Sequence, residues 1–358
     1  MRDASTISRR SLLGALALLP AARVLRGQQQ TPQAGTTYSA TVKVVNLLAT
    51  VRDKQGAIVK DLNQGDFVLD EDGRPQTIAY FSRETDLPLT LGLLVDTSLS
   101  QRNVLASERT ASSRFLDKVM RQDKDEAFVI HFDAEVELLQ DLTTSHDRLR
   151  KSVDELEVSR PQLNQRGSNG GDPQGGGYPG GQRGSPRPGT VLYDAVFLGS
   201  DEIMRKQKGR KALIVLSDGV DRGSKESLIS AVESAQRADT LVYSILFADQ
   251  GFYGSPGGFG GRGMGRRGGM GRGPMPETHD GKKVLEQISS ETGGRFFGVS
   301  HKLPIDKVFE AIDEELRSQY SIGYTSDNKD TSSEYRRIHL STKQKGLTVQ
   351  TREGYYPT

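Results

Sequence analysis

The sequence predicts an α/β fold in which helices cover both faces of a mostly parallel sheet, with β-rich segments at the two ends of the chain. Between residues 87 and 318, short apolar stretches with the character of strands alternate with stretches of helical periodicity. This alternation is typical of a parallel sheet with helices on both faces. Residues 36–86 and 319–358 instead hold strand-like stretches separated by turns.

The first 30 residues have the layout of an export signal. Arg9 and Arg10 precede an apolar run over residues 12–24, which is shorter than the ~20 residues that a membrane-spanning helix needs. The run Ser8-Arg9-Arg10-Ser11-Leu12-Leu13 resembles the twin-arginine export motif. We therefore predict a signal peptide over residues 1–30 and a periplasmic or extracellular protein, with membrane contact at most through this segment. An uncleaved anchor is the alternative.

The β-rich segment over residues 36–86 is too short to bury a core alone. The strands predicted in it cover residues 40–51, 67–69 and 78–81. The C-terminal residues 319–358 are equally rich in strands, predicted at 320–324, 335–340 and 347–352. We therefore expect the two segments to pack together as a β-sandwich-like domain that flanks the α/β domain.

The α/β part begins with a continuous apolar run at residues 89–95, as a central buried strand requires. Strands at 127–132 and 136–139 are joined too tightly for anything but a hairpin. The remaining strands are predicted at 212–216, 241–247 and 295–299. The helices are predicted at 104–119, 146–156, 191–204, 228–238, 282–290 and 305–316, and Gly293 is a plausible cap at the end of the fifth.

Two glycine-rich insertions interrupt this part of the chain, at residues 160–189 and 250–277. Of the 40 glycines, 10 lie in residues 166–189 and 12 in residues 251–273. Both tracts lack the apolar residues that would offset the entropy cost of ordering them. We expect them to be disordered excursions from an ordinary globular protein.

Hydroxyl and carboxylate side chains follow two predicted strands and precede one helix. Asp96, Ser98 and Ser100 come directly after the strand at 89–95, Asp218 follows the strand at 212–216, and Thr190 precedes a helix. The carboxyl ends of parallel strands meet at one edge of the sheet, where ligands bind. These are hard oxygen ligands, which suit Mg²⁺ or Mn²⁺. We expect Asp96 on a solvent-facing loop at this edge.

Each piece also has a simpler interpretation, since Asp and Ser are ordinary helix caps and Ser-Asp-Gly is an ordinary turn. Together and in this order, they resemble the metal-ion-dependent adhesion site (MIDAS) of von Willebrand factor type A domains, and residues 87–318 resemble that family throughout. The resemblance implies a doubly wound, Rossmann-like sheet of six strands with one antiparallel edge strand. It also implies that Asp96, Ser98 and Ser100 form the first metal loop, Thr190 the second and Asp218 the third.

Three further stretches look like the exported subgroup of this family that is abundant in acidobacteria. They are Glu291-Thr292-Gly293-Gly294-Arg295-Phe296, Glu315-Leu316-Arg317-Ser318-Gln319-Tyr320 and Arg352-Glu353-Gly354-Tyr355-Tyr356. The resemblance implies a protein-binding module, not an enzyme, in which the metal captures an Asp or Glu side chain of an unknown partner protein. A scaffold protein of the cell envelope with incidental or no metal binding is the alternative, and a metal-dependent hydrolase is the third.

Composition and motifs exclude several other classes. The absence of cysteine rules out disulfides and thiolate sites, and a net charge of +2 gives no reason to expect nucleic acid as a partner. A formal dinucleotide fingerprint at residues 258–263 lies in low-complexity glycine with no strand before it. There is no HExxH or Gly-x-Ser-x-Gly motif.

Overall fold

The computed structural model describes residues 44–83, 87–158, 189–247, 280–330 and 334–357. All of them belong to the compact unit that spans residues 42–358. The predicted signal peptide and the two predicted glycine-rich insertions lie outside the described residues, except for Gly189. Among the described residues, every helix is too short or too polar to span a membrane.

The centre of the structure is a six-stranded sheet in which all strands but one run parallel. In spatial order, its strands are β10 (Phe296–Gly298), β9 (Leu241–Leu246), β8 (Arg210–Ser217), β5 (Leu89–Asp96), β6 (Glu126–Phe132) and β7 (Val136–Thr143). Counted along the chain, this is the order 3-2-1-4-5-6 of a doubly wound sheet, with the third strand antiparallel. The α/β sheet and its antiparallel edge are therefore as predicted.

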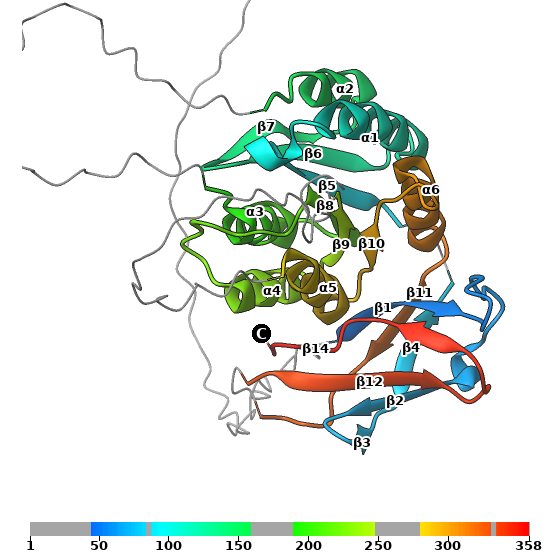
Figure 1. Ribbon diagram of the computed structural model, residues 1–358. Coiled ribbons are helices and arrows are strands. Elements are labelled where there is room, and N and C mark those ends of the chain that lie inside the picture. The colour runs from blue at the N-terminus through cyan, green and yellow to red at the C-terminus, as the bar shows by residue number, and fades with distance from the viewer. Residues whose placement is uncertain (1–43, 84–86, 159–188, 248–279, 331–333, 358) are drawn as a thin grey trace, which may run out of the picture. The chain divides into compact units, whose positions relative to one another are not determined.

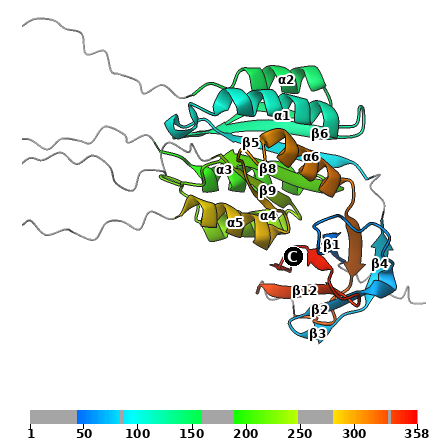
Figure 2. The same cartoon turned by 45° about the vertical axis from the view of Figure 1, so that its right-hand side comes forward.

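Helices cover both faces of this sheet (Figures 1 and 2). One face carries α1 (Leu105–Val119), α2 (His146–Asp154) and α6 (Ile305–Leu316), and the other carries α3 (Leu192–Leu198), α4 (Leu228–Arg237) and α5 (Gly281–Thr292). Every residue of β5 and β8 is buried, because each of these central strands packs against helices on both sides. This burial explains why the two strands are continuous apolar runs in the sequence.

Local differences from the predicted elements are few. The helix predicted at 191–204 is α3 followed by a π-helical turn, Gly199–Ile203, and a 3-10 turn, Met204–Lys206. The short strand predicted at 136–139 extends to Thr143, because β7 pairs with β6 along most of its length. Gly293 follows the last residue of α5 with φ +85°, the left-handed conformation expected of a glycine cap.

Both ends of the described chain contribute to two small antiparallel sheets. One has the order β13 (Thr348–Gln350), β1 (Val45–Arg52), β11 (Tyr320–Tyr324) and β4 (Ile78–Ser82). The other has the order β14 (Gly354–Tyr355), β12 (Arg336–Thr342), β2 (Phe67–Glu71) and β3 (Arg74–Pro75), with a 3-10 turn, Gln64–Asp66, before β2. The N-terminal strands thus pair with C-terminal strands. The two-residue strands β3 and β14 were not predicted from the sequence.

The two antiparallel sheets share one hydrophobic core. Its fully buried members include Leu47 and Val51 of β1, Ile322 of β11 and Leu69 of β2. Because each sheet combines strands from both ends of the chain, neither end could bury this core alone. That the two ends form a flanking domain of their own stays a prediction.

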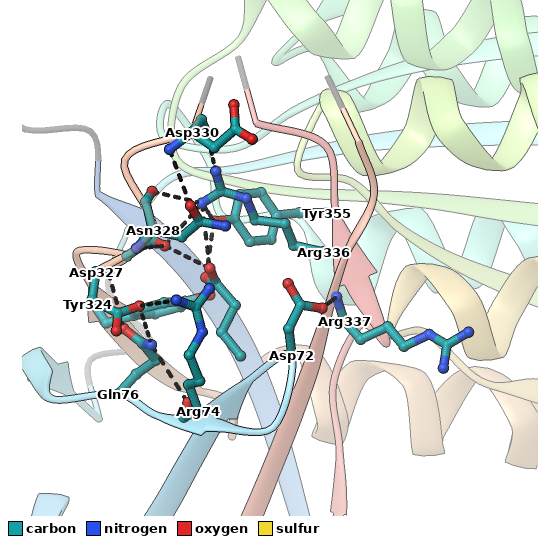
Figure 3. Close-up of polar contacts among 12 residues, drawn as sticks. Asp72, Arg74, Gln76, Tyr324, Asp327, Asn328, Asp330, Arg336, Arg337 and Tyr355 are labelled. Atoms are coloured by element: carbon teal, nitrogen blue, oxygen red, sulfur yellow. Dashed lines mark hydrogen bonds and ion pairs between the residues drawn. The ribbon is translucent and has the colours of Figure 1, made fainter. Parts of the chain in front are cut away.

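A buried carboxylate ties these strands together. Glu71, at the end of β2, is fully buried and accepts hydrogen bonds from the hydroxyls of Tyr324 (2.6 Å), Ser326 (2.5 Å) and Tyr355 (3.0 Å). Arg336 forms an ion pair with Glu71 at 3.3 Å and also donates to the backbone carbonyls of Asn328 and Asp330. Figure 3 shows Arg336 beside Tyr355 and the loop that carries Asn328 and Asp330. The network joins β2, β11, β12 and β14.

Candidate functional site

The candidate site lies at the edge of the six-stranded sheet where β5 and β8 end. The two strands run in parallel register, with Val95 opposite Leu216. Asp96 is the last residue of β5 and Ser217 the last residue of β8. The Ser217 hydroxyl donates to Asp96 Oδ2 at 2.8 Å, which joins the two strand ends directly. This edge is also where the strand order reverses, the usual ligand position in a doubly wound sheet.

The loop after β5 gathers two hydroxyl groups next to Asp96. The backbone N–H of Ser98 donates to Asp96 Oδ1 at 2.9 Å, and the hydroxyl oxygens of Ser98 and Ser100 lie 2.9 Å apart. A 3-10 turn, Leu99–Gln101, follows and leads into α1. The turn at Asp96 therefore brings together the three side chains predicted for the first metal loop.

The loop after β8 carries Asp218. Its Oδ1 accepts the backbone N–H of Val220 at 3.0 Å, and the Asp96 and Asp218 carboxylates are close enough to interact electrostatically. Gly219 follows with φ +77°, and a side chain there would approach the carbonyl oxygen of Gly281 to 2.1 Å. Only glycine fits this conformation and this contact with the start of α5. The position of Asp218 therefore depends on its glycine neighbour.

Backbone hydrogen bonds hold Thr190 at the same edge of the sheet. Its carbonyl accepts the N–H of Arg222, in the loop after β8, at 2.8 Å. The next N–H, that of Val191, donates to the carbonyl of Asp133, which directly follows β6. The Thr190 side chain is buried. These two bonds bind the segment to the neighbouring loops, as a second metal loop would require.

Three other polar residues of these loops have structural roles. Asp194 accepts the backbone N–H groups of Lys225 (2.9 Å) and Glu226 (2.8 Å). Asp221 accepts the Ser224 hydroxyl at 2.6 Å. These contacts fix the segment after β8 against the start of α3.

Asp96 is fully buried, so the expectation of a solvent-facing position for it was wrong. It terminates a central strand, and neighbouring side chains close over it. Burial raises the pKa of Asp96 to about 6; the Asp218 charge adds to this effect, and hydrogen bonds from Ser98 and Ser217 oppose it. Within the described part of the chain, neither Asp96 nor Asp218 has a basic partner. The site therefore has a negative charge that the protein itself leaves uncompensated.

Sequence reasoning missed Glu108 and Gln101 beside this site. Both are 1% exposed, and neither carboxyl oxygen of Glu108 nor either polar atom of the Gln101 amide has a hydrogen-bond partner among the described residues. Burial raises the pKa of Glu108 well above its ordinary value, and the Asp96 charge adds to this rise. The signal was present in the sequence, because Glu108 has helical spacing with Leu105 and Phe115 on the buried face of α1.

One imidazole lies near the site. His131 of β6 contacts the Thr97 hydroxyl through Nδ1 at 3.0 Å and Glu137 through Nε2 at 3.0 Å. This chain of contacts has the residue types of a nucleophile–histidine–acid triad. Thr97 is fully buried, however, so its hydroxyl is closed to a substrate. The arrangement is therefore unsuited to nucleophilic catalysis.

The donor set fits a hard divalent cation. Carboxylate and hydroxyl oxygens are the ligands that Mg²⁺ and Mn²⁺ take, and an ion would offset the uncompensated charge of Asp96 and Asp218. In the described ranges, no cluster of three or more His, Cys, Asp or Glu side chains could hold a metal. A metal here would consequently depend on hydroxyl groups and water in addition to the two carboxylates.

Comparisons with known proteins find similarity among solved structures alone. No protein-family model and no curated protein matches the chain. The structure of BatB from Bacteroides thetaiotaomicron shares 16% identity with it at a TM-score of 0.42, over 64% of this chain and 97% of that one. Proximal thread matrix protein 1 from the mussel byssus, in a form with a zinc-occupied MIDAS motif, shares 14% identity at a TM-score of 0.41, over 70% of this chain and 50% of that one. The strand order of this chain identifies the doubly wound sheet by itself.

Proposed function

We propose that this protein is an exported binding module of the von Willebrand factor A type, which captures an acidic side chain of a partner protein through one divalent cation. The observation that carries the proposal is the pairing of Asp96 and Asp218 at the sheet edge without any basic partner in the described structure, next to the hydroxyls of Ser98 and Ser100. Asp96, Ser98, Ser100, Thr190 and Asp218 would hold Mg²⁺ or Mn²⁺.

The chain's own residues would leave the site receptive to one more anionic ligand. Asp96 and Asp218 balance the two charges of the ion formally, while serine and threonine hydroxyls donate weakly. A bound cation would supply a Lewis-acidic position for an outside carboxylate. The attraction to that carboxylate grows as the interface excludes water. An Asp or Glu side chain of a partner protein is thus the ligand that best suits this set.

A binding role accounts for the site better than catalysis does. A metal hydrolase needs a base beside the ion to activate water. The nearby imidazole of His131 is engaged at both nitrogens, by Thr97 and by Glu137. We therefore propose a protein that is not an enzyme and acts in the periplasm or outside the cell, as Arg9-Arg10 and the apolar run after them indicate.

Capture of partners from a native envelope extract tests this function. The immobilised full chain should retain proteins in Mg²⁺ that it releases with chelator, and Asp218→Ala should retain none of them. Asp147→Ala is the matched control, since Asp147 is an exposed carboxylate of α2 that pairs with Arg150. Partner binding that is equal with and without metal would refute the adhesion function and favour a scaffold role.

A further inference from the structure

A polar pocket lies where β8 and β9 begin, at the opposite ends of these strands from the candidate metal loops. It has a volume of about 300 Å³. Its lining includes Lys208, Lys211 and Arg352 together with Asp239, Gln236 and Asn46. Asn46 belongs to β1 and Lys211 to β8, so the pocket joins the antiparallel strands to the α/β sheet.

Lys211 is a buried cation with few partners. Lys211 is 7% exposed, and its Nζ atom donates a hydrogen bond to the backbone carbonyl of Gln207 at 3.3 Å. An ammonium group can donate three hydrogen bonds, so this one contact leaves most of its capacity unused. Burial lowers the pKa of Lys211, an effect that the Asp239 charge opposes. Lys208, three residues earlier in the chain, also lines the pocket, is exposed and forms no ion pair with any described side chain.

Arg352 is the third cation of the lining and is better satisfied. Its guanidinium donates to Asp239 at 2.6 Å and to the carbonyls of Gln236 (3.3 Å) and Asn46 (2.8 Å). Its Nε atom is buried and has no partner within the described structure. Asp239 is the one acidic residue of the lining, so three basic side chains share one carboxylate there.

We propose that this pocket binds a small oxyanion, meaning a small molecule that carries a carboxylate or a phosphate group. Buried charges in proteins are usually paired, so a buried cation with unused donors is a suitable position for an anionic ligand. The volume is at the low end of the range for ligand sites, which points to a small molecule and not to a peptide. Lys211 would form the central contact, with Lys208 at the entrance and Arg352 Nε as a further donor.

The occupant would also stabilise the junction between β1 and the α/β sheet. Asn46 and Leu48 of β1 line one side of the pocket and residues 207–211 line another. A ligand that binds the folded chain and not the unfolded one stabilises it by RT ln(1 + [L]/Kd), so the melting temperature rises with the ligand concentration. Binding and thermal stabilisation should therefore appear together.

Calorimetric titration of the full chain with inorganic phosphate, and separately with succinate, tests this proposal at constant ionic strength and in chelator. We expect saturable binding of at least one of the two probes. Lys211→Gln should weaken it by about tenfold or more, because a charge-assisted hydrogen bond is lost. Lys208→Gln, at an exposed position that cannot disturb the core, should weaken it by about threefold, as expected for a partly screened charge. Lys206→Gln is the matched control, since Lys206 pairs with Glu202 outside the pocket and should leave binding unchanged.

The two probes separate the sources of the anion. Binding of phosphate alone would assign a phosphate-bearing ligand, and binding of succinate alone a carboxylate; either supports the proposal. No saturable binding of either probe by the wild-type chain would overturn it, because the pocket would then hold only water. Equal binding by the wild type, Lys211→Gln and Lys208→Gln would overturn it as well.

Discussion

Ser217 Oγ donates to Asp96 Oδ2 at 2.8 Å, so the last residue of β8 holds the carboxylate at the end of β5. The same hydroxyl accepts the N–H of Gly219 at 3.0 Å, which links this contact to the loop of Asp218. One side chain, absent from the predicted ligand set, therefore holds the Asp96 carboxylate and also contacts the backbone of the loop that carries Asp218.

Ser217→Ala should weaken Mn²⁺ binding by about tenfold, the usual effect of losing a residue that orients a metal ligand. The fold should persist, because only one hydroxyl is removed. Calorimetric titration of Mn²⁺ measures the change. Ser244→Ala is the matched control, since Ser244 also makes a buried hydroxyl contact, with Ser289 at 2.8 Å, but on β9. Equal affinities of the Ser217 variant and wild type would argue against an orienting role.

Asp96 should make the metal-free protein less stable at neutral pH. Burial, with the Asp218 charge, raises its pKa from 3.8 to about 6. A carboxyl with a raised pKa binds its proton more tightly in the folded state, so stability increases as the pH falls from 7 through 6 towards 4. Asp96→Asn should therefore raise the free energy of unfolding at pH 7 by about 1–3 kcal/mol in chelator.

Urea denaturation at pH 7 and pH 4 checks this prediction. The advantage of Asp96→Asn should nearly disappear at pH 4, where Asp96 is protonated in the folded wild type. A difference between the two proteins that is the same at both pH values would mean that the titration of Asp96 is not its cause.

The α/β sheet could be predicted because its strands and helices are long and strongly patterned. Thr90 is the one polar residue in the apolar run at residues 89–95, and β5 is buried along its whole length. The short strands β3 and β14 have two residues each and no periodicity. The strand β3 pairs across a tight turn with Asp70 and Glu71 of β2, and β14 pairs with Arg336 and Arg337 of β12. Sequence reasoning had no local signal for them.

The candidate ligands could also be predicted, since strand ends and turns set their positions, but their surroundings could not. The burial of Asp96 follows from the packing around the end of a central strand, which loop chemistry does not reveal. Lys211 belongs to no recognisable sequence motif, because its pocket is lined by residues of β1 and β8 that are distant in the sequence. Such features belong to tertiary packing.

Glu108→Leu should stabilise the metal-free protein and weaken metal binding. Both oxygens of Glu108 are buried without a described hydrogen-bond partner, and a buried polar group of this kind costs about 1–3 kcal/mol. Leucine would extend the apolar face of α1, so the free energy of unfolding should rise. A cation at Asp96 is attracted to an ionised carboxylate nearby. Loss of the Glu108 carboxylate should therefore reduce the affinity for Mn²⁺ by about threefold or more.

Ser112→Ala controls for the Glu108 experiment. The Ser112 hydroxyl lies on the same buried face of α1 and also lacks a described partner, but it carries no charge. Its removal should leave Mn²⁺ affinity unchanged. If Glu108→Leu leaves the affinity unchanged as well, Glu108 has no part in the metal site.

Glu71→Gln should destabilise the protein by about 3–5 kcal/mol, because it leaves Arg336 without its buried counter-charge. Thermal or urea denaturation of the full chain measures the loss. Glu314→Gln removes an exposed partner of Lys60 at 3.2 Å and should cost less than about 1 kcal/mol. Similar losses in the two variants would show that the network around Glu71 contributes no more than a surface ion pair.

Calorimetric titration of Mg²⁺ and Mn²⁺ into the full chain and into Asp218→Ala tests the central claim most directly. The wild type should bind one ion and Asp218→Ala none, since the variant lacks one of the two carboxylates that balance the ion's charge. Circular dichroism should show that the variant keeps its fold, because Asp218 lies in a loop after β8 and is not part of a buried core. Absence of metal binding by the wild type, or equal binding by both proteins, would contradict a metal site at the end of β5 and β8.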